Sequence, residues 1–160
     1  MNLDLDKKIE FSEDIQKQIL EMVKHTALKE NGETELFILK VHLLIEQLLE
    51  KVIKKSFPYP KSILESELTF SQKHAIVKAI CYQDSISLVF KDIGILNKIR
   101  NELAHNLESK RYERLFGELD SSLLIESGYE LKPNSLEKFK HRCYLLYGTL
   151  LGVCERLENS

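Results

Sequence analysis

The sequence has little glycine, proline or cysteine, no tryptophan, and no excess of charge of either sign. Its 160 residues include six glycines, three prolines and three cysteines, which excludes a collagen-like, loop-rich or disulfide-stapled protein. The 23 basic and 25 acidic residues leave a formal charge of −2. Any contact with nucleic acid is therefore expected to be local or to be assembled by oligomerisation.

Long apolar runs are also missing. No stretch reaches about 18 uninterrupted apolar residues, so the sequence predicts no membrane span and no membrane partner. The N-terminal segment MNLDLDKKIEFSED lacks the apolar core of a signal peptide, and we expect a cytoplasmic protein. Cys81, Cys143 and Cys154 lack C-x-x-C spacing and lie among apolar neighbours, which predicts buried, reduced thiols.

What the chain does contain is apolar residues at helical spacing. The hydrophobic fraction of 43% and the length suit a single domain over residues 1–160. No segment alternates with the period of two that strands require. The expected class is all-α, a single-domain bundle of five to six helices. We expect helices from Ser12 to Asn31-Gly32, over 33–57, over 71–80 with Ser71 as its cap, over 86–105, over 109–127 and from Ser135 onward, with one short helical turn within 59–69.

The expected helix over 33–57 is apolar around most of its circumference, as in the central helix of a bundle or one that also forms an oligomer interface. Its polar pair, His42 and Glu46, lies one turn apart. The pair could line a cleft. It could also form a solvated stripe together with Glu35 and Glu50, which is the interpretation that the pattern favours.

The polar trio Arg100, Asn101 and His105 crowds the C-terminal end of the expected helix 86–105. Asn101 and His105 are one turn apart and share a face. Arg100 lies about 140° from His105 on an ideal helix, so the two converge if the helix ends there or a second subunit supplies one of them. The alternative is an ordinary helix terminus, in which Arg100 pairs with Glu46 or Glu50 and His105 bonds the last free carbonyls.

The run Arg100-Asn101-x-x-x-His105 resembles the R-x(4–6)-H motif of the HEPN superfamily, in which a polar residue commonly follows the arginine. The resemblance implies an HEPN-like helical bundle that forms a homodimer with the motif in a shared cleft. It implies a metal-independent endoribonuclease without a cofactor, acting on RNA, such as a toxin or phage-defence effector with an antitoxin or other protein partner. The run is also similar to the mannitol operon repressor group, which implies a non-catalytic interaction or regulatory module.

The resemblance assigns catalytic roles to the three motif residues. His105 would transfer protons, the forked guanidinium of Arg100 would hold phosphate oxygens, and Asn101 would orient the imidazole or donate to the phosphate. The expected RNA contacts form a basic rim around the motif, with one aromatic side chain that could stack on a base: Lys98, Lys110, Arg111, Tyr112 and Arg114.

The remaining histidines and charge runs have simpler expectations. His25, His74 and His141 have no evident partner chemistry and are expected at the surface. The run that contains Lys138, Lys140 and Arg142 is expected to be a solvated helix face.

Overall fold

The computed structural model describes residues 11–26, 34–81, 86–105, 111–118 and 135–158. Within these residues every regular element is helical, and the expected all-α class is confirmed. The elements are α1 (Glu13–Thr26), α2 (Thr34–Ser56), α3 (Pro60–Leu64), α4 (Phe70–Cys81), α5 (Ser87–His105), the 3₁₀ helix η2 (Arg111–Glu118) and α7 (Ser135–Glu158).

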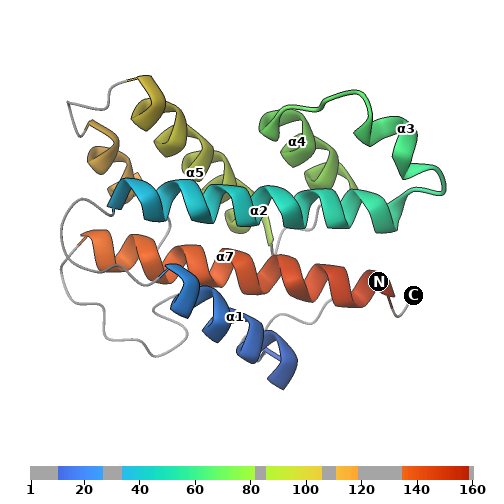
Figure 1. The fold of residues 1–160 in the computed structure, drawn as a ribbon, viewed down its shortest axis with the longest axis horizontal. Helices are drawn as coiled ribbons and strands as arrows, with labels where there is room; N and C mark the ends of the chain where they lie inside the picture. The colour runs from blue at the N-terminus through green and yellow to red at the C-terminus, as the bar shows by residue number, and fades with distance from the viewer. Residues whose placement is uncertain (1–10, 27–33, 82–85, 106–110, 119–134, 159–160) are drawn as a thin grey trace.

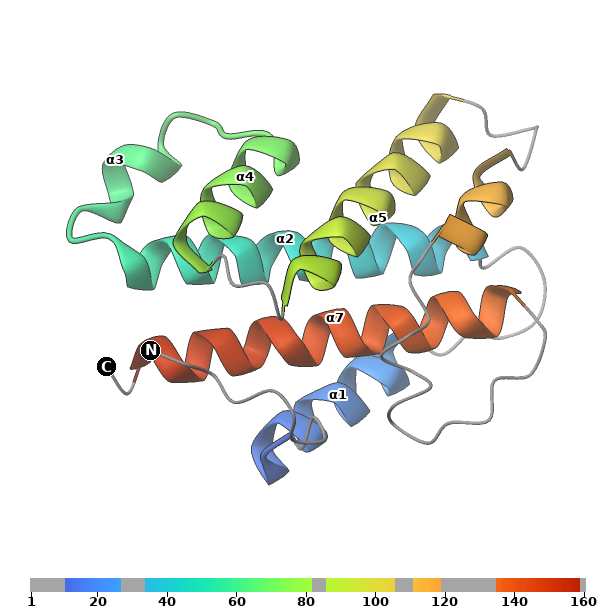
Figure 2. The ribbon, with the colours of Figure 1, turned by 180° about the vertical axis from the view of Figure 1, so that it is seen from behind.

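Helices α2 and α7 lie side by side at the centre of the bundle and run in the same direction (Figure 1). At their N-terminal ends the rings of Phe37 and Phe139 meet edge to face, with centroids 5.8 Å apart. At their C-terminal ends Lys55 and Glu158 form an ion pair. Helix α1 packs against α7, whereas α4 and α5 pack together on the opposite side of α2 (Figure 2). The bundle therefore has three layers, with α5 rising away from α2 toward its end at His105.

The position of α2 explains its composition. It contacts α1, α3, α4, α5 and α7, so most of its circumference is buried, and the expectation of a central helix is confirmed. Its outer side nevertheless carries Leu36, Leu39 and Leu43, all of which are exposed to solvent. These three leucines follow i, i+3, i+7 spacing and therefore form one apolar stripe on the surface.

Side-chain caps fix where two of the helices begin. The Ile15 amide donates to Ser12 Oγ at 3.3 Å, which caps α1 as the sequence predicts. For α4 the predicted cap, Ser71, was wrong, because Thr69 and Gln72 form a reciprocal capping box instead. Helix α4 thus begins at Phe70, and Ser71 lies inside its first turn.

Other expectations are met in part. The expected helix over 109–127 is a 3₁₀ helix over Arg111–Glu118, and residues 119–134 lie outside the described ranges. The first helix is described as far as Thr26, and the remainder of its expected range also lies outside. Cys143 and Cys154 are buried free thiols and Cys81 is a half-buried one. None of the described helices is both long enough and apolar enough to cross a bilayer.

Candidate functional site

The last turns of α5 hold the three motif residues. Leu96, Ile99 and Leu103 recur at i, i+3, i+7 and are fully buried, so they anchor this end of the helix in the core. Asn101 and His105 are exposed on the other side. The trio thus sits on a rigid helical segment with its polar groups turned toward solvent.

Arg100 is half-buried and lies on a different flank of α5 from His105. Its Nη1 donates to Asn101 Oδ1 at 3.3 Å, so the guanidinium is held beside the amide. Five residues along an ideal helix separate Arg100 and His105 by about 140° and about 7.5 Å of rise. The helix remains regular through His105, so a single chain does not turn both side chains to one face. Glu46 and Glu50 were the alternative partners expected for Arg100. Both accept hydrogen bonds from Lys73 of α4.

A hydrogen-bonded chain beside the motif joins α2, α5 and α4. His42 Nε2 lies 3.1 Å from Asn97 Oδ1, and Asn97 Nδ2 donates to Ser71 Oγ at 3.1 Å. A carbonyl oxygen accepts and does not donate, so the imidazole donates through Nε2. The ring of His42 stacks on Phe70 with centroids 4.1 Å apart. This arrangement fixes the relative positions of three helices one turn before Arg100.

The electrostatic surroundings of His42 favour its neutral form. Burial lowers the pKa of His42 below its ordinary value, and the positive charge of Arg100 lowers it further. The hydrogen bond to Asn97 and the charge of Glu46 act in the opposite direction but do not outweigh burial. Arg100 therefore lies close enough to His42 for the two to interact electrostatically.

The expectation of a solvated stripe on α2 was wrong. His42 is 6% exposed, and Glu46 and Glu50 both accept hydrogen bonds from Lys73 Nζ of α4, each at 2.7 Å. Burial alone lowers the pKa of Lys73, but its bonds to these two carboxylates outweigh burial and raise it. Glu35 accepts a hydrogen bond from the Tyr112 hydroxyl at 2.5 Å. These polar residues hold helices together.

The predicted basic rim is only partly present in the described residues. Lys98 is exposed on α5, and Arg114 is exposed on η2 with its Nη2 3.6 Å from Glu102. Tyr112 is 1% exposed, and burial together with Glu35 raises the pKa of its hydroxyl. Its proposed role of stacking on a base was therefore wrong, since the ring is part of the core. Lys110 and the side chain of Arg111 lie outside the described residues.

Two expectations of surface exposure were also wrong. Arg142 is 1% exposed and donates through Nε to Asp92, which is 0% exposed, so an ion pair joins α5 to α7 inside the core. Nη1 and Nη2 of Arg142 are buried without hydrogen-bond partners. His74 is half-buried with its ring stacked on Phe90, and burial lowers its pKa. His141 is half-buried beside Tyr144, and the side chain of His25 lies outside the described residues.

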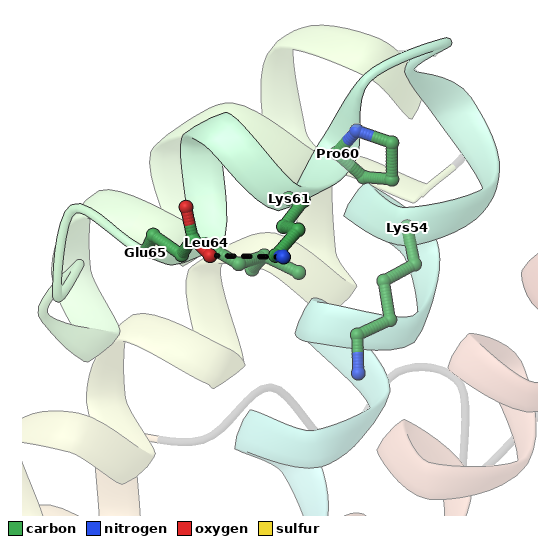
Figure 3. A pocket seen from close by; sticks show the side chains of 5 residues that line it. All are labelled: Lys54, Pro60, Lys61, Leu64 and Glu65. Atoms are coloured by element: carbon green, nitrogen blue, oxygen red, sulfur yellow. Dashed lines mark ion pairs between the residues drawn. The ribbon is translucent and has the colours of Figure 1, made fainter.

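A surface hollow of about 440 Å³ lies between the C-terminal end of α2 and the short α3, away from the motif (Figure 3). Its lining residues are Lys54, Pro60, Lys61, Leu64 and Glu65. Lys61 and Glu65 form an exposed ion pair at 3.5 Å. None of the predicted site residues lines this hollow. Among the described side chains, no three of His, Cys, Asp or Glu gather as a metal site requires.

Sequence reasoning missed the bond of Asn97 to His42, which connects α2 to the motif helix, and the bond of Asn97 to Ser71, which connects that helix to α4. The only signal was the position of Asn97 one turn before Asn101.

Comparison of the chain with models of protein families, with curated proteins and with solved structures found no match.

Proposed function

We propose that this protein is a metal-independent endoribonuclease of the HEPN type, with Arg100, Asn101 and His105 as its catalytic residues. One observation carries the proposal. Asn101 and His105 are exposed on one face of a core-anchored helix end, with Arg100 hydrogen-bonded to Asn101 beside them. The chemistry of these groups, an imidazole, a guanidinium and an amide, is what RNA cleavage without a metal requires.

The proposed reaction is an intramolecular transesterification. A base removes the proton of a 2′-hydroxyl, the resulting oxygen attacks the adjacent phosphorus, and the bond to the 5′-oxygen breaks as an acid protonates that oxygen. The products are a 2′,3′-cyclic phosphate and a free 5′-hydroxyl. Histidine is suited to both proton transfers near neutral pH, which assigns them to His105. The guanidinium of Arg100 stabilises the negative charge that develops on the phosphorane.

A second copy of the chain completes the site in this proposal. Arg100 and His105 point to different flanks of α5, about 140° apart. Two copies that face each other would bring the Arg100 of one beside the His105 of the other. They would also supply one histidine as base and one as acid. The proposed enzyme is therefore a homodimer, and RNA is its substrate.

The test compares wild-type protein with His105→Ala and Arg100→Gln on total RNA and tRNA in the presence of EDTA. We expect the wild type alone to yield products with 2′,3′-cyclic phosphate ends. His141→Ala is the matched control, because His141 lies on α7 outside the motif, and it should cleave like the wild type. If wild type and His105→Ala release the same products, the activity belongs to a contaminant and the proposal is wrong.

A second candidate, a non-catalytic interaction module, is favoured by the apolar stripe of Leu36, Leu39 and Leu43. Contiguous exposed leucines on the outer face of a helix are typical of surfaces that dock against a protein. Under this candidate no variant cleaves RNA, and Leu39→Ser/Leu43→Ser alters the oligomeric state measured by light scattering. Under the first candidate the wild type cleaves whether or not the leucines form the dimer contact.

A further inference from the structure

The outer face of α5 carries a second polar feature that continues the motif toward the start of the helix. Lys91, Lys98 and His105 are seven residues apart and all are exposed. Seven residues return to almost the same side of a helix, with a drift of about 20°. Gly94 and Asn101 fall between them at i+3 positions. These five residues form one stripe, here called the α5 stripe, about 21 Å long.

Helices α4 and α5 together contain more basic than acidic residues, although the whole chain is slightly negative. The 3₁₀ helix η2, which also packs on α5, contains two basic and two acidic residues. Helix α4, which packs beside α5, contains no acidic residue. Helix α5 contains two acids, and both are engaged. Asp92 is buried against Arg142, and Glu102 lies beside Arg114. Lys91 and Lys98 therefore lie on a helix whose two acids each have a cation from another helix beside them.

The stripe has the chemistry of a surface for a phosphate backbone. The phenylalanines of α4 and α5, Phe70 and Phe90, are both buried, so neither offers a phenyl ring on which a base could stack. Gly94 is half-buried and has no side chain, and a Cβ built there would contact the ring of His74 on α4 at 3.7 Å, so α4 lies close to this part of the stripe. The phosphate backbone of a nucleic acid could lie along the α5 stripe between the ammonium groups of Lys91 and Lys98.

We propose that the α5 stripe binds the backbone of single-stranded RNA through Lys91 and Lys98 and leads it to Asn101 and His105. This inference rests on the proposed function, since it places the substrate of that reaction. A single strand is the expected form because an A-form duplex holds the 2′-hydroxyl out of line with the 5′-oxygen that must leave. Binding through phosphates is independent of base sequence and depends strongly on salt.

The proposed path differs from a rim built on η2. Arg114 of η2 is already beside Glu102, and Tyr112 is in the core. The two lysines of the stripe instead precede the motif on the same rigid helix. The Cα atoms of these two lysines are about 10.5 Å apart along the axis of an ideal helix, the rise of seven residues.

The test measures RNA binding separately from cleavage. His105→Ala serves as the parent protein, and the probe is a fluorescein-labelled oligouridylate of about 12 nucleotides, within the site size of single-strand surfaces. Anisotropy titrations over a range of salt give the affinity and its salt slope. Lys91→Gln/Lys98→Gln is compared with Lys51→Gln/Lys54→Gln, which removes two exposed lysines from the outer side of α2.

We expect the Lys91→Gln/Lys98→Gln pair to reduce the salt slope by about 1.4, since each contact with a single strand contributes about 0.7. At 0.1 M salt this corresponds to roughly 25-fold weaker binding. The α2 pair should match the parent. The same stripe pair in a protein with His105 intact should slow cleavage at low RNA concentration and approach the wild-type rate at saturation.

The remaining outcomes separate the two proposals. If wild type cleaves RNA but the stripe pair binds like the parent, the path along α5 is wrong and the proposed function stands. Equal losses in the stripe pair and the α2 pair also overturn the path, because binding then follows total charge. If the stripe pair weakens binding while wild type never cleaves, the path stands and the catalytic proposal is wrong. A parent that binds no RNA at low salt overturns both.

Discussion

The two ends of α5 carry polar residues in opposite environments. Near its start Asp92 is fully buried and paired with Arg142 of α7, whereas near its end Asn101 and His105 are exposed. The first pair is explained by packing, because a buried charge requires a partner. Asn101 and His105 are not needed for packing, because the buried leucines and isoleucines of α5 already anchor this end of the helix in the core. The difference indicates where this helix is constrained by folding and where its polar residues are available for a ligand.

The largest effect on stability is expected from Arg142→Ala. It removes the guanidinium from the ion pair with buried Asp92, and breaking a buried pair by removing one member typically lowers the free energy of unfolding by about 3–5 kcal/mol. Urea denaturation followed by circular dichroism measures the change. A loss below about 1 kcal/mol would mean that water reaches Asp92, and the contrast between the two ends of α5 would not hold.

The matched control replaces both partners. Asp92→Leu/Arg142→Met removes the two charges together, and well-packed apolar replacements of a buried pair are often neutral or stabilising. It also removes the unpartnered Nη1 and Nη2 of Arg142 from the core. The double variant should therefore be more stable than Arg142→Ala by several kcal/mol. Equal destabilisation of the two proteins would indicate that the loss comes from a packing defect and not from breaking the ion pair.

The next largest effect is expected at Asn97, which lies between the two ends. Asn97→Ala leaves His42 Nε2 without its acceptor on α5, and an unsatisfied buried donor costs about 1–3 kcal/mol. Ser71→Ala is the control, because Ser71 is exposed and water can replace its hydroxyl. In thermal denaturation, Asn97→Ala should have a clearly lower melting temperature than Ser71→Ala. The same rank order in cleavage would show that the His42–Asn97–Ser71 chain also positions Arg100.

Sequence patterning predicted the fold well because the residues near each helix end determine where most of the helices begin and end. Apolar spacing and the prolines after Phe57 placed α2, and Ser12 placed α1. Buried polar contacts were not predictable, because they depend on which helices become neighbours. Arg142 and Asp92 are 50 residues apart and His42 and Asn97 are 55 apart, and nothing local in the sequence pairs them.

The candidate site shows the same division. Arg100, Asn101 and His105 lie within less than one and a half turns of one helix, so the proximity of Asn101 to each of the other two could be predicted from helix geometry. The roles of Glu46, Glu50 and Tyr112 could not, because each depends on a partner from another element.

A smaller effect concerns pH. His42 has a pKa below its ordinary value of 6.5, so below that pH the unfolded chain binds more protons than the folded one. The stabilisation that neutral His42 contributes is therefore fully present above about pH 6.5, and it is lost as the pH falls through the pKa of His42 in the folded state. His74, whose pKa is also lowered, adds a loss of the same sign. The difference in unfolding free energy between wild type and His42→Asn should therefore narrow on acidification. A constant difference between pH 7 and pH 5 would mean that the pKa of His42 is the same in the folded and the unfolded chain.

The smallest effect on stability is expected from His105→Ala, at the exposed end of α5. Surface substitutions usually change the free energy of unfolding by no more than about 0.5 kcal/mol, and the buried anchors Ile99 and Leu103 remain in place. Cleavage, in contrast, should fall by about 10²–10⁴, the usual contribution of a general acid or base. Urea denaturation and initial rates with EDTA, measured on the same preparation, give both numbers. If the variant loses stability in proportion to activity, the role of His105 is to stabilise the end of the helix and not to catalyse cleavage. A stable variant without activity would assign the exposed end of α5 to catalysis and leave its buried end to folding.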